Sequence, residues 1–188
     1  MYLFETTIQY FYSALAQTIA TAFGFIGIVV FFKLQNTMQA LKNLASAITA
    51  GITFAEHKEF EANYHEENWN SFTKYLKEND SLKEILKHFH RTNYANLFVN
   101  HYEHKERIIA SFIKTLVLTI VGIVASFLLL SLSRYWSVNF FSSFATLGVG
   151  FFLIGRCFAY YLRLIFVVLD YEFSWKQIYK YCFSRWYI

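Results

Sequence analysis

The sequence predicts an all-α integral membrane protein with three transmembrane helices and a long helical extension on the cytoplasmic side. Hydrophobic residues make up 56% of the 188 residues, above the roughly 45–50% of a typical soluble domain. The chain contains no proline, which suits long uninterrupted helices better than a sheet with many turns. Three apolar runs, residues 10–32, 108–132 and 140–169, each exceed the ~20 residues that a helix needs to cross the hydrocarbon core.

The first predicted segment, residues 1–32, contains the first transmembrane helix. A cleavable signal peptide would begin with basic residues, whereas this segment begins without any and includes Glu5. We therefore expect the helix to remain on the mature protein.

The second predicted segment, residues 33–107, is cytoplasmic and neutral, with ten Lys/Arg and ten Asp/Glu. The spacing of Trp69, Phe72 and Leu76 predicts a short amphipathic helix. Ser81 and Glu84 resemble a capping box at the start of another helix. Asn93 is the expected cap of a helix that continues into the second span.

The remaining segments are a transmembrane hairpin at residues 108–169 and an amphipathic tail at 170–188 on the inner surface. Residues 1–9 contain no Lys or Arg, and the tail adds Lys176, Lys180 and Arg185 to the ten basic residues of 33–107. Because basic loops stay in the cytoplasm, the N-terminus is expected outside and the C-terminus in the cytoplasm. Tyr10 and Tyr12 are expected in the outer aromatic belt.

A heptad repeat begins in the first span and continues beyond it. Its alternating spacings of 3 and 4 link Gln17, Ala20, Gly24, Gly27, Phe31, Leu34, Met38, Leu41, Ala45, Ile48, Ile52 and Ala55. This spacing is typical of a left-handed helix seam and predicts one helix from Tyr10 to about Phe60. Apart from chance, two interpretations stay open: packing on another helix of the same chain, or a homo-oligomeric seam formed by Ala20, Gly24, Gly27, Leu34, Met38, Leu41, Ile48 and Ile52.

Polar residues inside the spans are the candidate functional positions, because such residues usually face protein or water. They are Gln17, Thr21, Lys114, Thr115, Arg156 and Arg163. No Asp or Glu lies inside any span, which argues against a proton-driven stator and an acidic cation filter. Lys114 and Arg163 lie near the inner boundary, where snorkelling explains them. For the deeper Arg156, both snorkelling and a role with anions or lipid headgroups stay open.

An enzyme is not expected. All six histidines lie between residues 57 and 104, and the pairs His101/His104 and Glu61/His65 have metal-compatible helical spacing. A histidine-metal membrane enzyme is therefore a third alternative, but no motif supports it, and we expect no cofactor or metal. Cys157 and Cys182 are expected as packing residues. The net charge of +4 comes from residues in and beside the spans, so direct nucleic-acid binding is not expected.

Two resemblances bear on function. The order of one span, a cytoplasmic helical segment and a hairpin is similar to ExbB/TolQ stator subunits, and Ala145-Thr146-Leu147-Gly148 looks like part of their third span. The Pro and Glu of that family are missing, which counts against a motor role. Residues 11–35, FYSALAQTIATAFGFIGIVVFFKLQ, resemble the first span of small bacterial membrane proteins. These include membrane subunits of anti-phage systems such as Kiwa and the CRISPR-associated membrane proteins.

The second resemblance implies a bacterial inner-membrane subunit that works with a cytoplasmic partner protein in anti-phage defence. Together with the seam, it leads us to expect an oligomeric subunit that anchors this partner at the membrane. The neutral, aromatic and histidine-rich residues 57–107 would be the docking surface. A pore-forming or membrane-depolarising effector, in which the polar faces of the spans line a water path, is the alternative.

Overall fold

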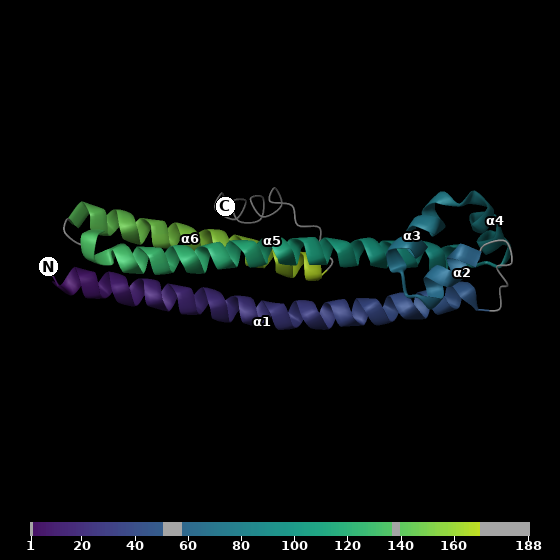
Figure 1. The fold of residues 1–188 in the computed structure, drawn as a ribbon, viewed down its shortest axis with the longest axis horizontal. Helices are drawn as coiled ribbons and strands as arrows, with labels where there is room; N and C mark the ends of the chain where they lie inside the picture. The colour runs from purple at the N-terminus through teal and green to yellow at the C-terminus, as the bar shows by residue number, and fades with distance from the viewer. Residues whose placement is uncertain (1, 51–57, 137–139, 170–188) are drawn as a thin grey trace, which may run out of the picture. The chain divides into compact units, whose positions relative to one another are not determined.

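A computed structural model of the chain describes residues 2–50, 58–136 and 140–169 (Figure 1). Within these ranges all regular secondary structure is α-helical, which confirms the predicted all-α class for the described residues. In chain order the helices are α1 (Tyr2–Thr49), α2 (Lys58–His65), α3 (Trp69–Glu78), α4 (Asp80–His88), α5 (Thr92–Trp136) and α6 (Phe140–Val168).

Three of these helices, α1, α5 and α6, are long and apolar enough to cross a membrane. They contain 48, 45 and 29 residues, against the ~20 that a crossing requires. The apolar stretches that the sequence predicts lie in these three helices, in the same order.

The chain divides into two compact units, which are described separately. Of the described residues, 2–30, 108–136 and 140–169 belong to one, called the apolar unit below. Residues 31–107 form the other, called the polar unit. Helices α1 and α5 each contribute to both units because they continue through the divisions at 30/31 and 107/108.

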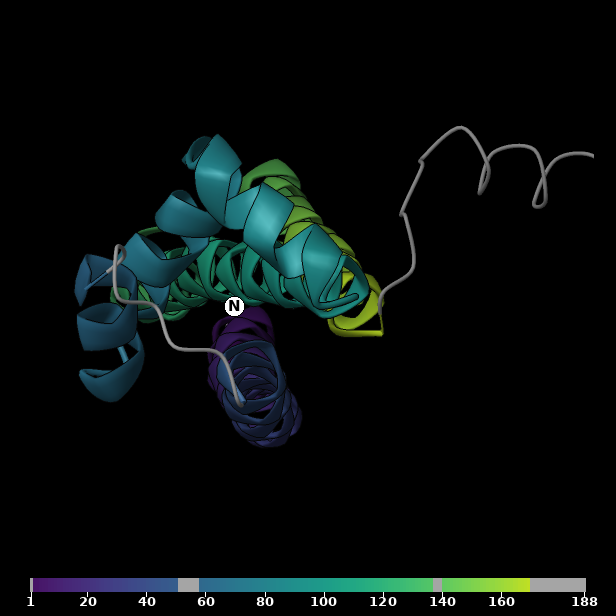
Figure 2. The same ribbon diagram turned by 90° about the vertical axis from the view of Figure 1, so that its right-hand side faces the viewer.

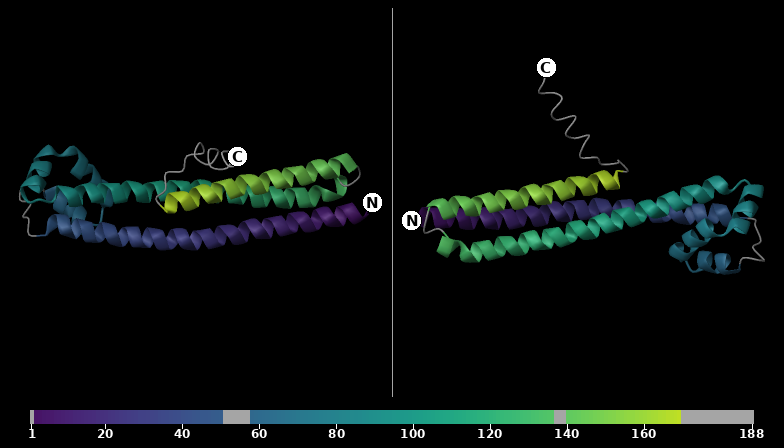
Figure 3. Two further views of the ribbon diagram at one scale, coloured as in Figure 1. Left: turned by 180° about the vertical axis from the view of Figure 1, so that it is seen from behind. Right: turned by 90° about the horizontal axis from the view of Figure 1, so that it is seen from above.

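In the apolar unit, α1, α5 and α6 run alongside one another (Figure 3). The rings of Phe23 on α1 and Phe112 on α5 are stacked at 5.4 Å, and Phe11 on α1 lies 5.4 Å from Phe151 on α6. Gly150 is needed for the close approach of α6 to α1, because a Cβ there would collide with the ring of Phe11. Small residues of this kind let membrane helices pack tightly.

The polar unit has its own hydrophobic core, and its short helices α2, α3 and α4 lie together (Figure 2). The ring of Phe72 lies 4.4 Å from Phe60 of α2 and 4.9 Å from Phe98 of α5. Trp69, Phe72 and Leu76 are all buried, so the predicted apolar face of α3 is confirmed. The full core consists of Leu41, Ala45, Ile48, Phe60, Trp69, Phe72, Leu76, Leu82, Leu86, Ala95 and Phe98.

Helix boundaries differ from the predicted ones at three places. Helix α1 ends at Thr49 rather than near Phe60, which belongs to α2. The N-cap of α4 is Asn79, not Ser81, because the Asn79 side chain accepts a hydrogen bond from the backbone N–H of Leu82 at 3.0 Å. Helix α5 begins at Thr92, so Asn93 lies inside its first turn. Ile52 and Ala55 of the predicted seam, and the predicted tail at 170–188 with Cys182, lie outside the described residues.

Candidate functional site

The predicted polar residues of the spans lie on two different sides of the apolar unit. On α5, Thr115 is buried, together with Thr119 and Ser126 one and three turns further on. On α1, Gln17 and Thr21 are exposed. The sequence places each set on one helix face, and the structure turns the α5 set inward and the α1 set outward.

The inward set is part of a hydrogen-bonded cluster centred on Tyr161 of α6. The Tyr161 hydroxyl lies 3.0 Å from Thr119 Oγ1 on α5 and 3.2 Å from the carbonyl oxygen of Ile19 on α1. Thr119 donates its own proton to the carbonyl of Thr115 at 2.8 Å. Tyr161 donates its one proton to the Ile19 carbonyl, and in the contact with Thr119 either hydroxyl can be the donor. One hydroxyl therefore contacts both α1 and α5 from α6.

A second interhelical bond runs from the Tyr12 hydroxyl on α1 to the carbonyl oxygen of Thr146 on α6. Tyr12 is fully buried between the helices rather than on the outer surface of the bundle, and its predicted place in an aromatic belt stays a prediction. Tyr10, two residues earlier, is 74% exposed and keeps a surface position. Neither buried tyrosine was predicted as a linking residue, because in a chain with 14 tyrosines no spacing distinguishes Tyr12 and Tyr161.

The outward face of α1 is formed by small and polar residues. Ala14, Gln17, Ala20, Thr21 and Gly24 are exposed, with Phe25 and Ile28 as the large apolar residues of the same stretch. Apart from the adjoining backbone of α1 itself, no atom of the described residues lies within 4 Å of a Cβ built on Gly24 or Gly27. The first half of the predicted seam, from Gln17 to Gly24, is therefore on this face and is not covered by the described part of the chain.

The outward face of α5 is different. Between residues 115 and 130 every exposed residue of α5 is apolar: Val117, Ile120, Val121, Val124, Phe127 and Leu128. This composition suits contact with lipid tails, whereas small and polar residues are enriched where membrane helices meet one another. The outward face of α5 therefore suits contact with lipid, whereas the outward face of α1 suits contact with another helix.

The second half of the predicted seam is covered by the chain itself. Leu41, Ala45 and Ile48 are fully buried in the core of the polar unit, and Met38 packs against that core. Leu34 is half-buried. Leu41 and Ile48 are therefore not available for contact with a second copy, and intramolecular packing accounts for this half of the repeat.

The cationic residues predicted inside the spans, Lys114, Arg156 and Arg163, are all exposed rather than directed at the Tyr161 cluster. The guanidinium of Arg156 lies 5.8 Å from the ring centroid of Phe152, one turn earlier on α6. Arg156 has no ion-pair partner among the described residues. Arg156 lies near the middle of α6, and its charge is on the outside of the bundle.

In the polar unit the aromatic residues predicted to form a docking surface are largely in the core. Phe60, Trp69, Phe72 and Phe98 are buried. Among residues 58–107 the exposed large apolar residues are Phe89, in the turn after α4, and Tyr94 and Leu97, which share one face of α5. The guanidinium of Arg91 lies 5.8 Å from the ring centroid of Tyr94. This patch, Phe89, Tyr94 and Leu97, is smaller than the surface expected from the sequence.

The two histidine pairs have different environments. His104 is buried and His101 half-buried on α5, whereas His65 and Glu61 form an exposed contact of 3.9 Å on α2. Within residues 2–50, 58–136 and 140–169, no three His, Cys, Asp or Glu side chains are grouped so that they could hold a metal ion. Cys157 is buried on α6 and faces Gly122 of α5. A Cβ atom added to Gly122 would lie 3.3 Å from the Cys157 sulfur.

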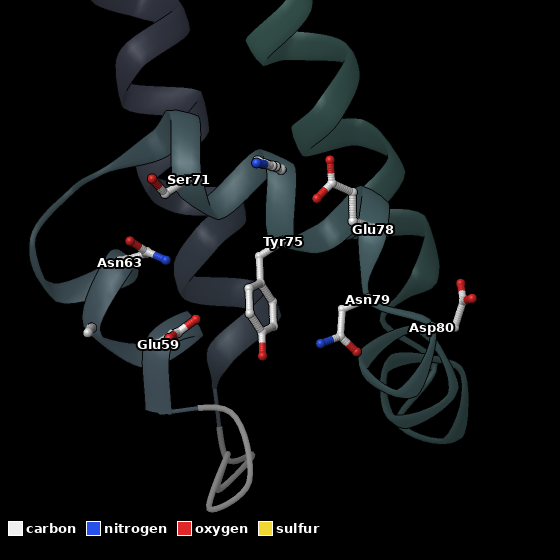
Figure 4. A pocket seen from close by; sticks show the side chains of 9 residues that line it. Glu59, Asn63, Ser71, Tyr75, Glu78, Asn79 and Asp80 are labelled. Atoms are coloured by element: carbon white, nitrogen blue, oxygen red, sulfur yellow. The ribbon is translucent and has the colours of Figure 1, made fainter.

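An open cleft of ≈ 680 Å³ lies among α2, α3 and the start of α4 in the polar unit. Figure 4 shows Tyr75 projecting between Glu59 on one side and Asn79 on the other. Three carboxylates, Glu59, Glu78 and Asp80, and one ammonium group, Lys74, line it. The hydrogen bond from Lys83 to Asp80 holds the pKa of that carboxyl below its usual value.

Comparison with protein-family models, curated proteins and solved structures found no match to this chain. The resemblances noted from the sequence therefore stay predictions, and the function is argued below from the chain's own residues.

Proposed function

We propose that this chain is an oligomeric membrane subunit that associates through the outward face of α1 and holds a cytoplasmic partner protein at the membrane. The single observation that carries the proposal is the contrast between two outward faces of one bundle. Between residues 115 and 130 the exposed residues of α5 are all apolar, whereas the face of α1 carries Gln17, Ala20, Thr21 and Gly24.

The physical reason is the lack of a hydrophobic force between helices in lipid. Helices there associate where small residues allow close backbone approach and where polar side chains find partners. Ala20 and Gly24 supply the first property, and Gln17 and Thr21 supply the second. An amide left in lipid tails would lose the hydrogen bonds that water provides, so a second protein surface is the favourable neighbour of Gln17.

Copy number in lipid nanodiscs, measured by native mass spectrometry, tests the association. Gly24→Leu enlarges an outward position of α1 where an added Cβ meets no neighbouring helix of the described chain, so it should shift the protein towards monomer. Val124→Phe enlarges an outward position of α5 and is the matched control, which should leave the copy number unchanged. A wild-type protein that stays monomeric at all concentrations would refute the proposal.

The proposed orientation has the N-terminus outside, the polar unit and the C-terminus in the cytoplasm, and the bacterial inner membrane as the location. The ten Lys/Arg of residues 33–107 and their absence from residues 1–9 support it. Single cysteines at Asn36 and Thr6, in a background without Cys157 and Cys182, test this orientation. An impermeant maleimide applied to intact cells should label position 6 and spare position 36, and the reverse would invert the topology.

For the partner protein, the exposed patch of Phe89, Tyr94 and Leu97 is the proposed docking position. Exposed aromatic residues beside an arginine, here Tyr94 and Arg91, are typical of the centre of protein interfaces. Affinity capture of the full-length protein from its native cells should recover a partner, and Tyr94→Ser with Leu97→Ser should lose it. The control Asn70→Ser changes an exposed position of α3. The anchoring role fails if no partner is captured while the purified protein alone produces the cellular phenotype.

A pore-forming effector is the second candidate, and the exposed charge of Arg156 favours it. In an oligomer, Arg156 with Gln17 and Thr21 could line a shared water path that prefers anions. A charge near the centre of a lone span costs about 2.5–3.5 kcal/mol on insertion scales, and water in a channel would remove that cost. In planar bilayers a pore should conduct and Arg156→Leu should reduce anion preference while insertion holds, whereas an anchoring subunit should be silent.

The proposed role in anti-phage defence rests on the layout and the first-span resemblance alone. We propose no catalytic reaction. Phage challenge of cells that carry the gene with its neighbouring genes tests the role. Protection that is lost with Gly24→Leu and kept with Val124→Phe would connect defence to the α1 face, and equal plaque counts with and without the genes would refute it.

A further inference from the structure

A second cleft, of ≈ 750 Å³, lies in the polar unit between the end of α3, the length of α4 and the first turns of α5. Its volume falls within the roughly 300–1,000 Å³ of small-molecule sites. Leu76, Leu86 and Ala95 belong to the hydrophobic core and form an apolar floor with Val99. The polar lining residues are Lys77, Lys83, Lys87, Thr92, Asn96 and Asn100.

The charged groups of this cleft are all of one sign. Three ammonium groups line it and no lining residue is acidic, whereas the neighbouring cleft has three carboxylates and one ammonium group. Residues 33–107 contain equal numbers of basic and acidic side chains. The gathering of lysines is therefore a local separation of charge rather than a consequence of a basic unit.

The lysines are available to a ligand. Lys83 pairs with Asp80 at 2.8 Å and Lys77 with Glu103 at 2.5 Å, but these pairs are about half exposed or more. Such pairs are weak because water competes for both partners. Lys87 has no ion-pair partner among the described residues. Asn96 and Asn100, one turn apart on α5, add amide donors beside the ammonium groups.

We propose that this cleft binds a phosphate-bearing small molecule. Its phosphate would lie among Lys77, Lys83 and Lys87, and its apolar body would lie on the floor of Leu76, Leu86 and Val99. Ammonium groups on flexible stems suit phosphate oxygens from several directions. Thr92 begins α5, and the amino end of a helix also favours negative charge. This inference is independent of the proposed anchoring and association.

Calorimetry on the full-length protein in phosphatidylcholine nanodiscs tests the cleft with three probes: sodium pyrophosphate, ADP and dihexanoyl phosphatidic acid. ADP or phosphatidic acid should bind more tightly than pyrophosphate, because only these two can also cover the apolar floor. Tighter binding of ADP would identify the ligand as a soluble nucleotide-like compound, and tighter binding of phosphatidic acid would identify it as a lipid headgroup. Lys87→Gln should weaken that binding about tenfold, the loss expected for one charge-assisted contact.

The matched control is Lys74→Gln, which removes the same charge from the acidic cleft and should leave binding unchanged. Lys83→Gln is the second cleft variant and should weaken binding if Lys87→Gln fails to fold. The proposal is overturned if none of the probes binds saturably, if pyrophosphate binds as tightly as the other two, or if Lys74→Gln weakens binding as much as the cleft variants.

Discussion

Tyr161→Phe removes the one hydroxyl that joins α1, α5 and α6, and leaves the ring in place. The lost contacts are those to Thr119 Oγ1 at 3.0 Å and to the Ile19 carbonyl at 3.2 Å. Thr119 keeps its bond to Thr115, so no hydroxyl is left without an acceptor. Interhelical hydrogen bonds in membrane proteins average about 0.6 kcal/mol and reach about 1.7. We therefore expect a loss of about 1 kcal/mol in the stability of the apolar unit.

The buried thiol of Cys157, one turn before Tyr161, measures this stability directly. Cys157 is 3% exposed, so in a Cys182→Ser background opening of the bundle should speed its reaction with a small maleimide. A loss of about 1 kcal/mol should raise the labelling rate roughly fivefold. Tyr160→Phe is the matched control, since Tyr160 is half-buried and has no hydrogen bond among the described residues, and its rate should change less than about twofold. Equal rates for the two variants would refute the linking role of Tyr161.

Three further changes test other parts of the structure. Gly150→Ala should destabilise the apolar unit by about 1–3 kcal/mol, because the added methyl group collides with Phe11. Gly148→Ala is the control, since its methyl group meets open space. The Cys157 labelling rate should rise for Gly150→Ala and stay unchanged for Gly148→Ala. Asn79→Ala should cost about 0.5–2 kcal/mol by removing the cap of α4, seen as faster amide exchange at Leu82. The hydrogen bond from Lys77 lowers the pKa of Glu103. This ion pair therefore stabilises the fold fully at pH values above the ordinary glutamate pKa, and the stabilisation is lost as the pH falls through the lowered pKa of Glu103. The stability difference between wild type and Glu103→Gln should therefore shrink on acidification, and a difference that grows would contradict the ion pair.

The sequence is sufficient for the features that depend on one helix at a time. Apolar length predicts the candidate spans α1, α5 and α6, and the 3–4 spacing of Trp69, Phe72 and Leu76 predicts the buried face of α3. Helix ends are less certain because several residues can cap the same turn. Asn79 and Ser81 both precede α4, and only the structure shows that the Asn79 side chain reaches the N–H of Leu82.

Features that depend on which neighbour a helix meets are not predictable from periodicity. The sequence places Gln17 with Thr21 on one face and Thr115 with Thr119 on another, but it does not tell which face is turned inward. The heptad repeat illustrates the same limit. Its residues at Leu41 and Ile48 pack in the core of the polar unit, whereas Ala20 and Gly24 lie on the outside of the apolar unit. One continuous pattern therefore has two different environments.

In the proposed assembly, protein covers the outward face of α1 and lipid covers the outward face of α5. Spin labels at Gly24 and Val124, each on a single cysteine in liposomes, test it through accessibility to oxygen, which concentrates in lipid tails. We predict low oxygen accessibility and restricted motion at position 24, and high accessibility and free motion at position 124. Equal, lipid-like accessibility at both positions would contradict the claim, because α1 would then face the bilayer as α5 does.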